Sequence, residues 1–142
     1  MQSPIWLLFA ILSAAFAALV AIFGKLGLGK VDTTVATMAR AAIMFLFLLI
    51  TVLLSGKMSG LNLIHGRALV YILLAGVAGA LSWIFYFWAL KLGRASAVAS
   101  VDRTSVVMVI VLAALFLGEK IGWKTGLGAV LIAAGAVLVA LA

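Results

Sequence analysis

The chain has 142 residues, of which 68% are hydrophobic and only 9% are charged, with a net charge of +7 and no cysteine. Soluble domains are about 45–50% apolar and about 25% charged, so this composition excludes a soluble globular protein. The ten basic residues are spread along the chain and form no basic face, which excludes a nucleic-acid-binding protein. The lack of cysteine excludes disulfide bonds and thiolate metal sites.

Five apolar stretches follow one another along the chain, separated by short polar loops. They predict helices over residues 4–24, 33–54, 67–90, 96–117 and 123–141. About 20 apolar residues are enough to cross a bilayer as a helix. The runs are continuous and rich in Leu and Ala, without the alternation of a membrane β-barrel. We therefore expect an all-α, polytopic inner membrane protein, a bundle of five transmembrane helices in one domain over 1–142.

Local signals support the helix starts. Ser3 is a suitable N-cap and Pro4 fits a first helical turn, while Asp32 is a suitable N-cap for the helix over 33–54. The first residues lack the charged region of a signal peptide, so we expect the first apolar stretch to be retained.

The basic residues of the loops are almost evenly divided between the two sides of the membrane. Four lie in the first and third loops and four in the second and fourth, at positions Lys25, Lys30, Lys91, Arg94 and Lys57, Arg67, Lys120, Lys124, respectively. Orientation follows the asymmetry of Lys and Arg in short loops. Two interpretations stay open: weaker signals set a single orientation, or copies insert both ways and pair antiparallel.

Three charged residues are predicted to lie within the membrane: Arg40, Asp102 and Arg103. Only 14 apolar residues follow Arg40 in its helix, and 14 follow Arg103. Each run covers about 21 Å, less than the hydrocarbon core of about 30 Å. One interpretation is that these side chains line a solvated path and bind substrate. The other is that Asp102 pairs with an arginine, or that the arginines extend to the headgroups.

Polar and aromatic residues near these charges are further candidates for substrate contact. Ser100 shares a helix face with Arg103, and Ser13 is the most polar residue within the helix over 4–24. Trp83 and Phe87 are four residues apart on one face of the helix over 67–90, and Tyr86 adds a hydroxyl. These rings belong either to an interfacial aromatic belt or to the wall of a substrate cavity.

Small residues in the helix over 123–141 indicate close helix packing. Gly128 and Gly135 lie seven residues apart in a helix with no charge after Lys124. Such residues let membrane helices approach closely, either in a homodimer or within one chain. Elsewhere the sequence has no metal-binding constellation, catalytic triad or phosphate-binding loop, so we expect neither an enzyme nor a bound cofactor.

Several segments together resemble the EamA-type unit of the drug/metabolite transporter superfamily. They are VASVDRTSVV over 98–107, LFLGEK over 115–120, the pattern GxGxxLIxxG over 126–135, FxALKxGxAS over 87–96, and Lys25-x-Gly27 with Arg40. The resemblance covers nearly the whole chain, whose length is similar to that of half-size, five-helix members. It implies one EamA-like repeat, and an export or exchange carrier that must assemble, because ten-helix relatives contain two such units in opposite orientation.

One departure from the related small multidrug exporters bears on the substrate. Those four-helix proteins use a glutamate in their first helix to exchange protons for cationic drugs, whereas residues 4–24 contain no acid here. A zwitterionic or anionic small molecule is therefore the better expectation. We expect a homodimeric carrier of a small polar or amphipathic metabolite, in which Arg40 and Arg103 bind a carboxylate of the substrate. The alternatives are a multidrug cation exporter that uses Asp102, and a non-transporting membrane subunit or lipid-headgroup translocation partner.

Overall fold

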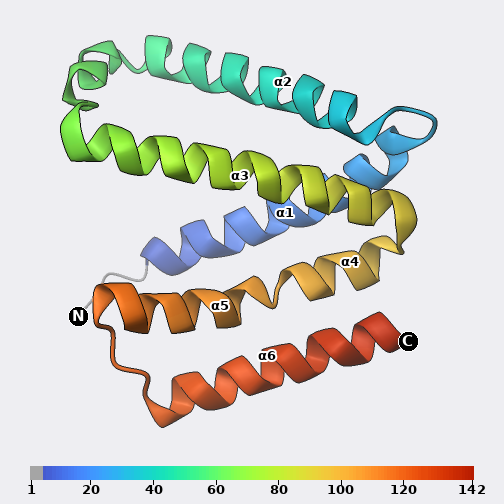
Figure 1. Ribbon diagram of the computed structural model, residues 1–142. Helices are drawn as coiled ribbons and strands as arrows, with labels where there is room; N and C mark the ends of the chain where they lie inside the picture. The colour runs from blue at the N-terminus through green and yellow to red at the C-terminus, as the bar shows by residue number, and fades with distance from the viewer. Residues whose placement is uncertain (1–4) are drawn as a thin grey trace. The chain divides into compact units, whose positions relative to one another are not determined.

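The structure is a computed structural model that describes residues 5–142, and every long element in this part of the chain is a helix (Figure 1). Five spans are long and apolar enough to cross a membrane: Ile5–Leu28, Thr33–Leu54, Gly66–Leu92, Ala95–Leu117 and Trp123–Leu141. The predicted all-α class and the five apolar spans are thereby confirmed. The expected helix start at Pro4, with Ser3 as its cap, lies outside the described residues.

The helices follow the expected order, with two short elements added. The elements are α1 (Ile5–Leu28), α2 (Thr33–Leu54), the 3₁₀ turn η1 (Met58–Leu63), α3 (Gly66–Leu92), α4 (Ala95–Asp102), α5 (Ser105–Leu112), the π-helical turn η2 (Ala113–Leu117) and α6 (Trp123–Leu141). The bounds of α2 and α6 coincide with the predicted ranges 33–54 and 123–141. Helix α1 extends four residues past the predicted end at Gly24, and its additional turn buries Leu28.

Asp32 caps α2 as the sequence predicts. One oxygen of its side chain accepts hydrogen bonds from the backbone N–H groups of Thr34 at 2.8 Å and Val35 at 3.1 Å. These N–H groups belong to the first turn of the helix and have no partner within it. The bonds lower the pKa of Asp32, Val35 contributing most, and nearby Lys91 lowers it further.

The span over 95–117 is broken, although the sequence predicts one continuous helix over 96–117. Helix α4 ends at Asp102 and α5 begins at Ser105. The Thr104 N–H donates to the Val101 carbonyl at 3.0 Å, and the Thr104 hydroxyl donates to the same carbonyl at 2.7 Å. Local hydrogen bonds of Ser and Thr compete with the helical ladder and bend membrane helices. At its far end, the span closes in a π turn, and Gly118 takes the left-handed conformation with φ 69°.

The chain divides into two compact units, which are described separately. One unit contains residues 5–26 and 92–142 of the described chain and is called here the Arg103 unit. The other contains residues 27–91 and is called here the Arg40 unit. In the Arg103 unit, α6 packs against α4 and α5, and its buried residues are alanines, Ala129 and Ala136. Small side chains of this kind allow helices to pack closely in a membrane.

The sequence Lys-Leu-Gly occurs twice, over 25–27 and 91–93. In each unit, the lysine of one of these segments donates a hydrogen bond to a loop carbonyl. In the Arg103 unit, the Lys25 ammonium donates to the Gly93 carbonyl at 2.7 Å. In the Arg40 unit, the Lys91 ammonium donates to the Val31 carbonyl at 3.1 Å. Both lysines therefore satisfy loop carbonyls that lie outside regular helix.

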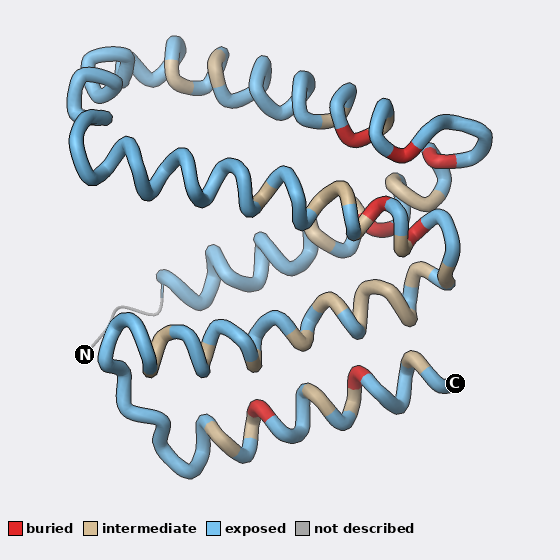
Figure 2. The backbone as a smooth tube through the Cα atoms, viewed as in Figure 1, coloured by how far each residue is buried: buried red, intermediate tan, exposed pale blue. Residues whose placement is uncertain are grey.

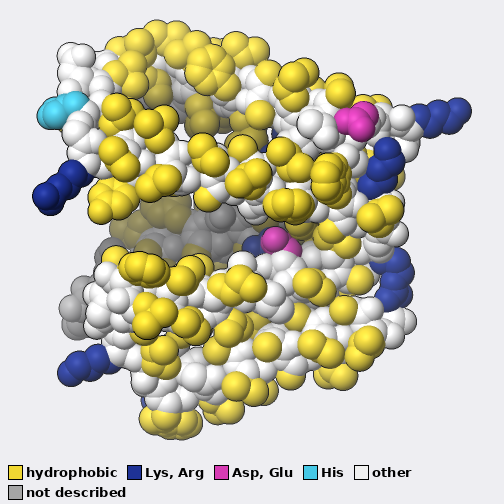
Figure 3. Space-filling view, viewed as in Figure 1, with side chains coloured by type: hydrophobic (Ala, Val, Ile, Leu, Met, Phe, Trp, Pro, Cys, Tyr) yellow, Lys and Arg dark blue, Asp and Glu magenta, His cyan; other side chains and the backbone are white. Residues whose placement is uncertain are grey.

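Burial is sparse along the spans, and this is expected of helices that lipid surrounds. At most 6% of the 18-residue core of any span is buried within the described chain. The few buried positions of the Arg40 unit gather near the start of α2 and the end of α3 (Figure 2). Hydrophobic side chains cover most of the visible surface of the helices (Figure 3). Water would solvate so much apolar surface poorly, so lipid or a partner helix must cover it.

Candidate functional site

Two arginines lie about two helical turns inside a span, one in each unit, whereas Arg67 lies at the very start of α3. Arg40 is seven residues beyond the start of α2, and Arg103 is eight residues beyond the start of α4. At 1.5 Å per residue, these positions are about 10 Å and about 12 Å along their spans. Ionisable residues at such depth are costly, and they ordinarily face a partner or a wet cavity. The surroundings of each guanidinium are therefore the main clue to function.

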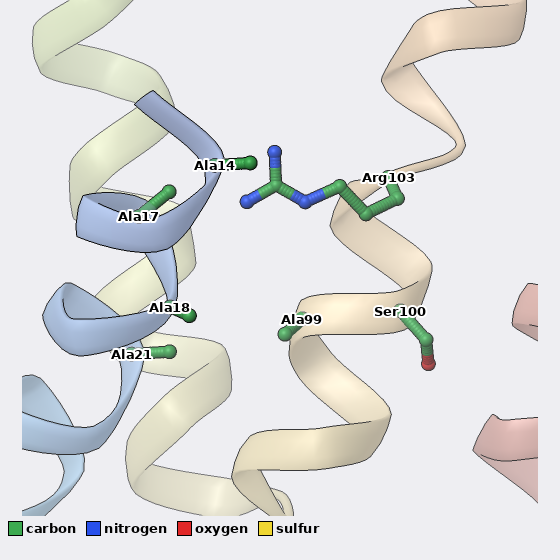
Figure 4. A pocket seen from close by; sticks show the side chains of 7 residues that line it. All are labelled: Ala14, Ala17, Ala18, Ala21, Ala99, Ser100 and Arg103. Atoms are coloured by element: carbon green, nitrogen blue, oxygen red, sulfur yellow. The ribbon is translucent and has the colours of Figure 1, made fainter. Parts of the chain in front are cut away.

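Arg103 lies at a cavity of about 350 Å³ in the Arg103 unit. Its side chain extends from the end of α4 toward Ala14 on α1 (Figure 4). The other α1 residues that line the cavity are also alanines, and α4 contributes Ala99 and Ser100. The wall opposite the guanidinium thus consists of methyl groups, which accept no hydrogen bond. Because alanines are small, they leave room beside the charge.

No acceptor within the described residues binds the Arg103 guanidinium. Arginine carries five N–H donors in a rigid fork that suits carboxylate and phosphate groups. Asp102, its neighbour in sequence, is half-buried and does not line the cavity. Ser13, a further candidate from the sequence, is exposed on α1 and is likewise not part of the lining. The fork is therefore available to a ligand or water.

The break beside Arg103 changes the backbone at the same level of the span. The Thr104 N–H bonds to Val101 instead of its α-helical acceptor, the Ser100 carbonyl, and the Val106 N–H bonds to Arg103 instead of Asp102. The Ser100 hydroxyl donates to the Ala97 carbonyl at 2.9 Å. Interrupted helices of this type expose backbone carbonyls and are tolerated in membranes where they line a cavity. The interrupted backbone after Asp102 and the Arg103 guanidinium therefore lie at the same level of the span.

Arg40 has different surroundings, in the Arg40 unit. Its guanidinium carbon is 3.5 Å from the centre of the Trp83 ring and 5.8 Å from the centre of the Phe87 ring. At 3.5 Å the guanidinium is in van der Waals contact with the indole face, which is a cation–π arrangement. This contact joins α2 to α3 at the depth of the charge.

The aromatic residues that the sequence places on one side of α3 contact one another. Trp83 and Phe87 have ring centres 5.9 Å apart, and Trp83 and Tyr86 form an edge-on pair at 5.5 Å. Phe87 is buried, whereas Trp83 and Tyr86 are half-buried. The cluster beneath Arg40 is therefore a group of three rings, of which two are partly exposed.

The structure sorts the predicted site residues into two groups and leaves two outside them. Arg40 lies with Trp83, Tyr86 and Phe87. Arg103 and Ser100 line a cavity, while Asp102 and Ser13 do not. Sequence reasoning missed the alanine wall of α1, because alanine in an apolar helix carries no functional signal. The spacing of Ala14, Ala17, Ala18 and Ala21 on one helix face was the available clue.

Comparison with known proteins is informative for the whole chain. The model of the EamA-like transporter family matches residues 4–141. A curated relative from Sinorhizobium sp, described as an uncharacterized transporter in the cobO 3′ region, is 42% identical over 139 residues. The match covers 98% of this chain and 99% of the relative. No solved structure matches the chain. The family that the sequence motifs predicted is thereby confirmed.

Proposed function

The chain belongs to the EamA-like transporter family, and we propose that it is a secondary carrier, in the inner membrane, of a small polar or amphipathic metabolite that bears a carboxylate. The observation that carries this proposal is the Arg103 guanidinium, which borders a cavity inside a span and has no acceptor among the described residues. An unpaired cation in such a place is stable only with water or an anion. A carboxylate fits the fork with two parallel hydrogen bonds.

The cavity supports a small substrate with an apolar part. About 350 Å³ lies at the small end of the range of ligand pockets, about 300–1,000 Å³. Its alanine wall suits a hydrocarbon group, and Arg103 suits a carboxylate at the opposite end of the same molecule. The freed backbone carbonyls at the helix break suit an ammonium group, so zwitterions are included in the proposed class.

A homodimer is part of the proposal, with α6 as the contact and an antiparallel pair as one arrangement. A side chain built on Gly128 or Gly135 would meet nothing within 4 Å in its own chain. Both glycines are half-buried but have room for at least a methyl group, so they are packed less tightly than the buried alanines of the same helix. Positions that need no glycine for internal packing are suited to the close approach of a second copy.

The rival with the same transporter class is a multidrug cation exporter in which Asp102 replaces the missing glutamate. Asp102 is the one acidic residue inside the described spans, and the α3 rings are a conventional surface for organic cations. Arg40, however, already covers the Trp83 face, and Arg103 adds another cation about two helical turns inside a span. The balance of charge favours an anionic group on the substrate.

The test is uptake of radiolabelled monocarboxylates and amino acids by proteoliposomes that contain the purified protein. We expect uptake of at least one of them, and a loss of tenfold or more in Arg103→Gln. The matched control is Arg94→Gln, which removes an equal charge from the loop before α4 in the same unit. Equal uptake by the native protein and Arg103→Gln would contradict the proposal, as would an equal loss in both variants.

A further inference from the structure

We infer that Arg40 is a specificity-determining residue: it occupies the face of Trp83 that an organic cation would need, and so makes the Arg40 unit select against cations. The inference deepens the proposed function, because it names which ligands the carrier refuses. It concerns binding by residues 27–91 and does not require that transport be measured.

The Arg40 guanidinium lies over the face of the Trp83 ring. A cation binds an aromatic ring when it lies over the face within about 6 Å of the centroid. The guanidinium carbon of Arg40 is already 3.5 Å from the Trp83 centroid, leaving no space for a ligand on that side. It is also within range of Phe87, at 5.8 Å. The charge therefore covers the two rings that the sequence places on one helix face.

The three rings of the cluster also contact one another. Tyr86 meets Trp83 edge-on at an interplanar angle of 80° and meets Phe87 at 73°. Phe87 is only 3% exposed. An incoming cation would therefore have to displace Arg40 or lie beside it, where two positive charges repel each other in a medium of low dielectric constant.

The N–H edge of the Arg40 guanidinium suits an anion rather than a cation. A guanidinium carbon this close to the ring centre fits a guanidinium that lies flat on the ring, an arrangement that leaves its N–H donors directed outward in the plane. No hydrogen-bond acceptor within the described residues takes them. A carboxylate can approach this edge and form paired hydrogen bonds, while the indole holds the fork in place. One residue thus blocks cations and offers a site to anions.

The experiment measures binding of tetraphenylphosphonium, a permanent organic cation, to the full-length protein in lipid nanodiscs. The native protein should bind it weakly, with no saturation below the millimolar range. Arg40→Leu and Arg40→Gln uncover Trp83 and should each raise the affinity at least tenfold. Adding Trp83→Ala to either variant should remove the gain. Arg67→Leu, which deletes an exposed charge at the start of α3 in the same unit, should leave binding within twofold of native.

Three results would overturn the inference. They are micromolar binding by the native protein, affinities in both Arg40 variants within twofold of native, and an equal gain in Arg67→Leu. Circular dichroism during thermal unfolding identifies a variant that does not fold. If neither Arg40 variant folds, the affinity of the native protein for tetraphenylphosphonium alone tests the inference. A protein that moves no solute would refute the carrier proposal and leave these binding results unchanged, so the two failures are distinguishable.

Discussion

The two units hold an arginine inside a span in contrasting ways. In the Arg103 unit, the facing side chains are alanines, which leave a cavity of about 350 Å³ beside the charge. In the Arg40 unit, the facing side chains are aromatic, and Trp83 lies in contact with the charge. Small residues thus provide room for a ligand, whereas large flat residues fix the cation and shield one of its faces. We therefore propose that arginines at similar distances along two helices have different roles, Arg103 as a substrate ligand and Arg40 as a residue that selects against cations.

The largest expected effect comes from filling the cavity of the Arg103 unit, which would remove the difference between the two units. Ala18→Phe places a ring among the small residues of α1, and the cavity cannot hold both that ring and a substrate. We expect carboxylate uptake by proteoliposomes to fall tenfold or more. Ala15→Phe is the matched control, because Ala15 is exposed on the same helix and does not line the cavity. Uptake that stays within twofold of native in Ala18→Phe would show that substrate does not enter here.

A second prediction separates small residues that face their own chain from those that do not. Ala136→Leu crowds a buried position of α6 and should destabilise the fold by about 1–3 kcal/mol. A Cβ atom at Gly135 meets nothing within 4 Å in its own chain, so Gly135→Leu should change the stability of the monomer less than Ala136→Leu does, while weakening the dimer. Single-molecule photobleaching in lipid gives the dimer fraction, and thermal unfolding gives the stability. A Gly135→Leu protein that still dimerises fully would remove α6 from the proposed interface.

The smallest expected effect concerns the start of α2 in the Arg40 unit. Hydrogen bonds from Val35 and Thr34 lower the pKa of Asp32 below its unfolded value. A lowered pKa gives stability that is fully present above a pH of about 4 and is lost as the pH falls through the folded-state pKa. Amide hydrogen-exchange protection of Thr34 and Val35 should therefore decline in acid.

Asp32→Asn is the control for this effect, because asparagine caps a helix without a titratable charge. Its protection factors should not change over the same acid range. Protection in the native protein that is constant down to pH 2 would contradict this interpretation of the cap.

Much of the fold could be predicted because bilayer thickness and hydropathy determine it directly. The five spans and the Asp32 cap depend on local composition and local hydrogen bonds, which the sequence displays. The break after Asp102 could not be predicted, since the sequence does not show whether a threonine hydroxyl bonds to the backbone within an intact helix or interrupts it. Four extra residues of α1 were also missed, because burial of Leu28 outweighs the helix-ending tendency of Gly24 and Gly27.

The candidate site could be predicted only in part. Charged residues inside apolar helices are conspicuous, so the position of Arg40 and Arg103 within the spans could be predicted from the sequence alone. Their surroundings depend on contacts between helices far apart in the chain. Stacking of Arg40 on Trp83 joins residues 43 positions apart, and the wall opposite Arg103 comes from α1, more than 80 residues away. Neither contact has a local signature.

The most direct test of the account is the distance between a bound carboxylate and an arginine inside the membrane. Rotational-echo solid-state NMR measures it with ¹⁵N-arginine-labelled protein in lipid and a panel of ¹³C-carboxyl monocarboxylates from acetate to benzoate. We expect dipolar dephasing for at least one of them, at a nitrogen-to-carbon distance of about 4 Å, as bidentate pairing requires. The dephasing should be lost in Arg103→Gln and retained in Arg94→Gln. No dephasing with any carboxylate at saturating concentration, or undiminished dephasing in Arg103→Gln, would contradict it.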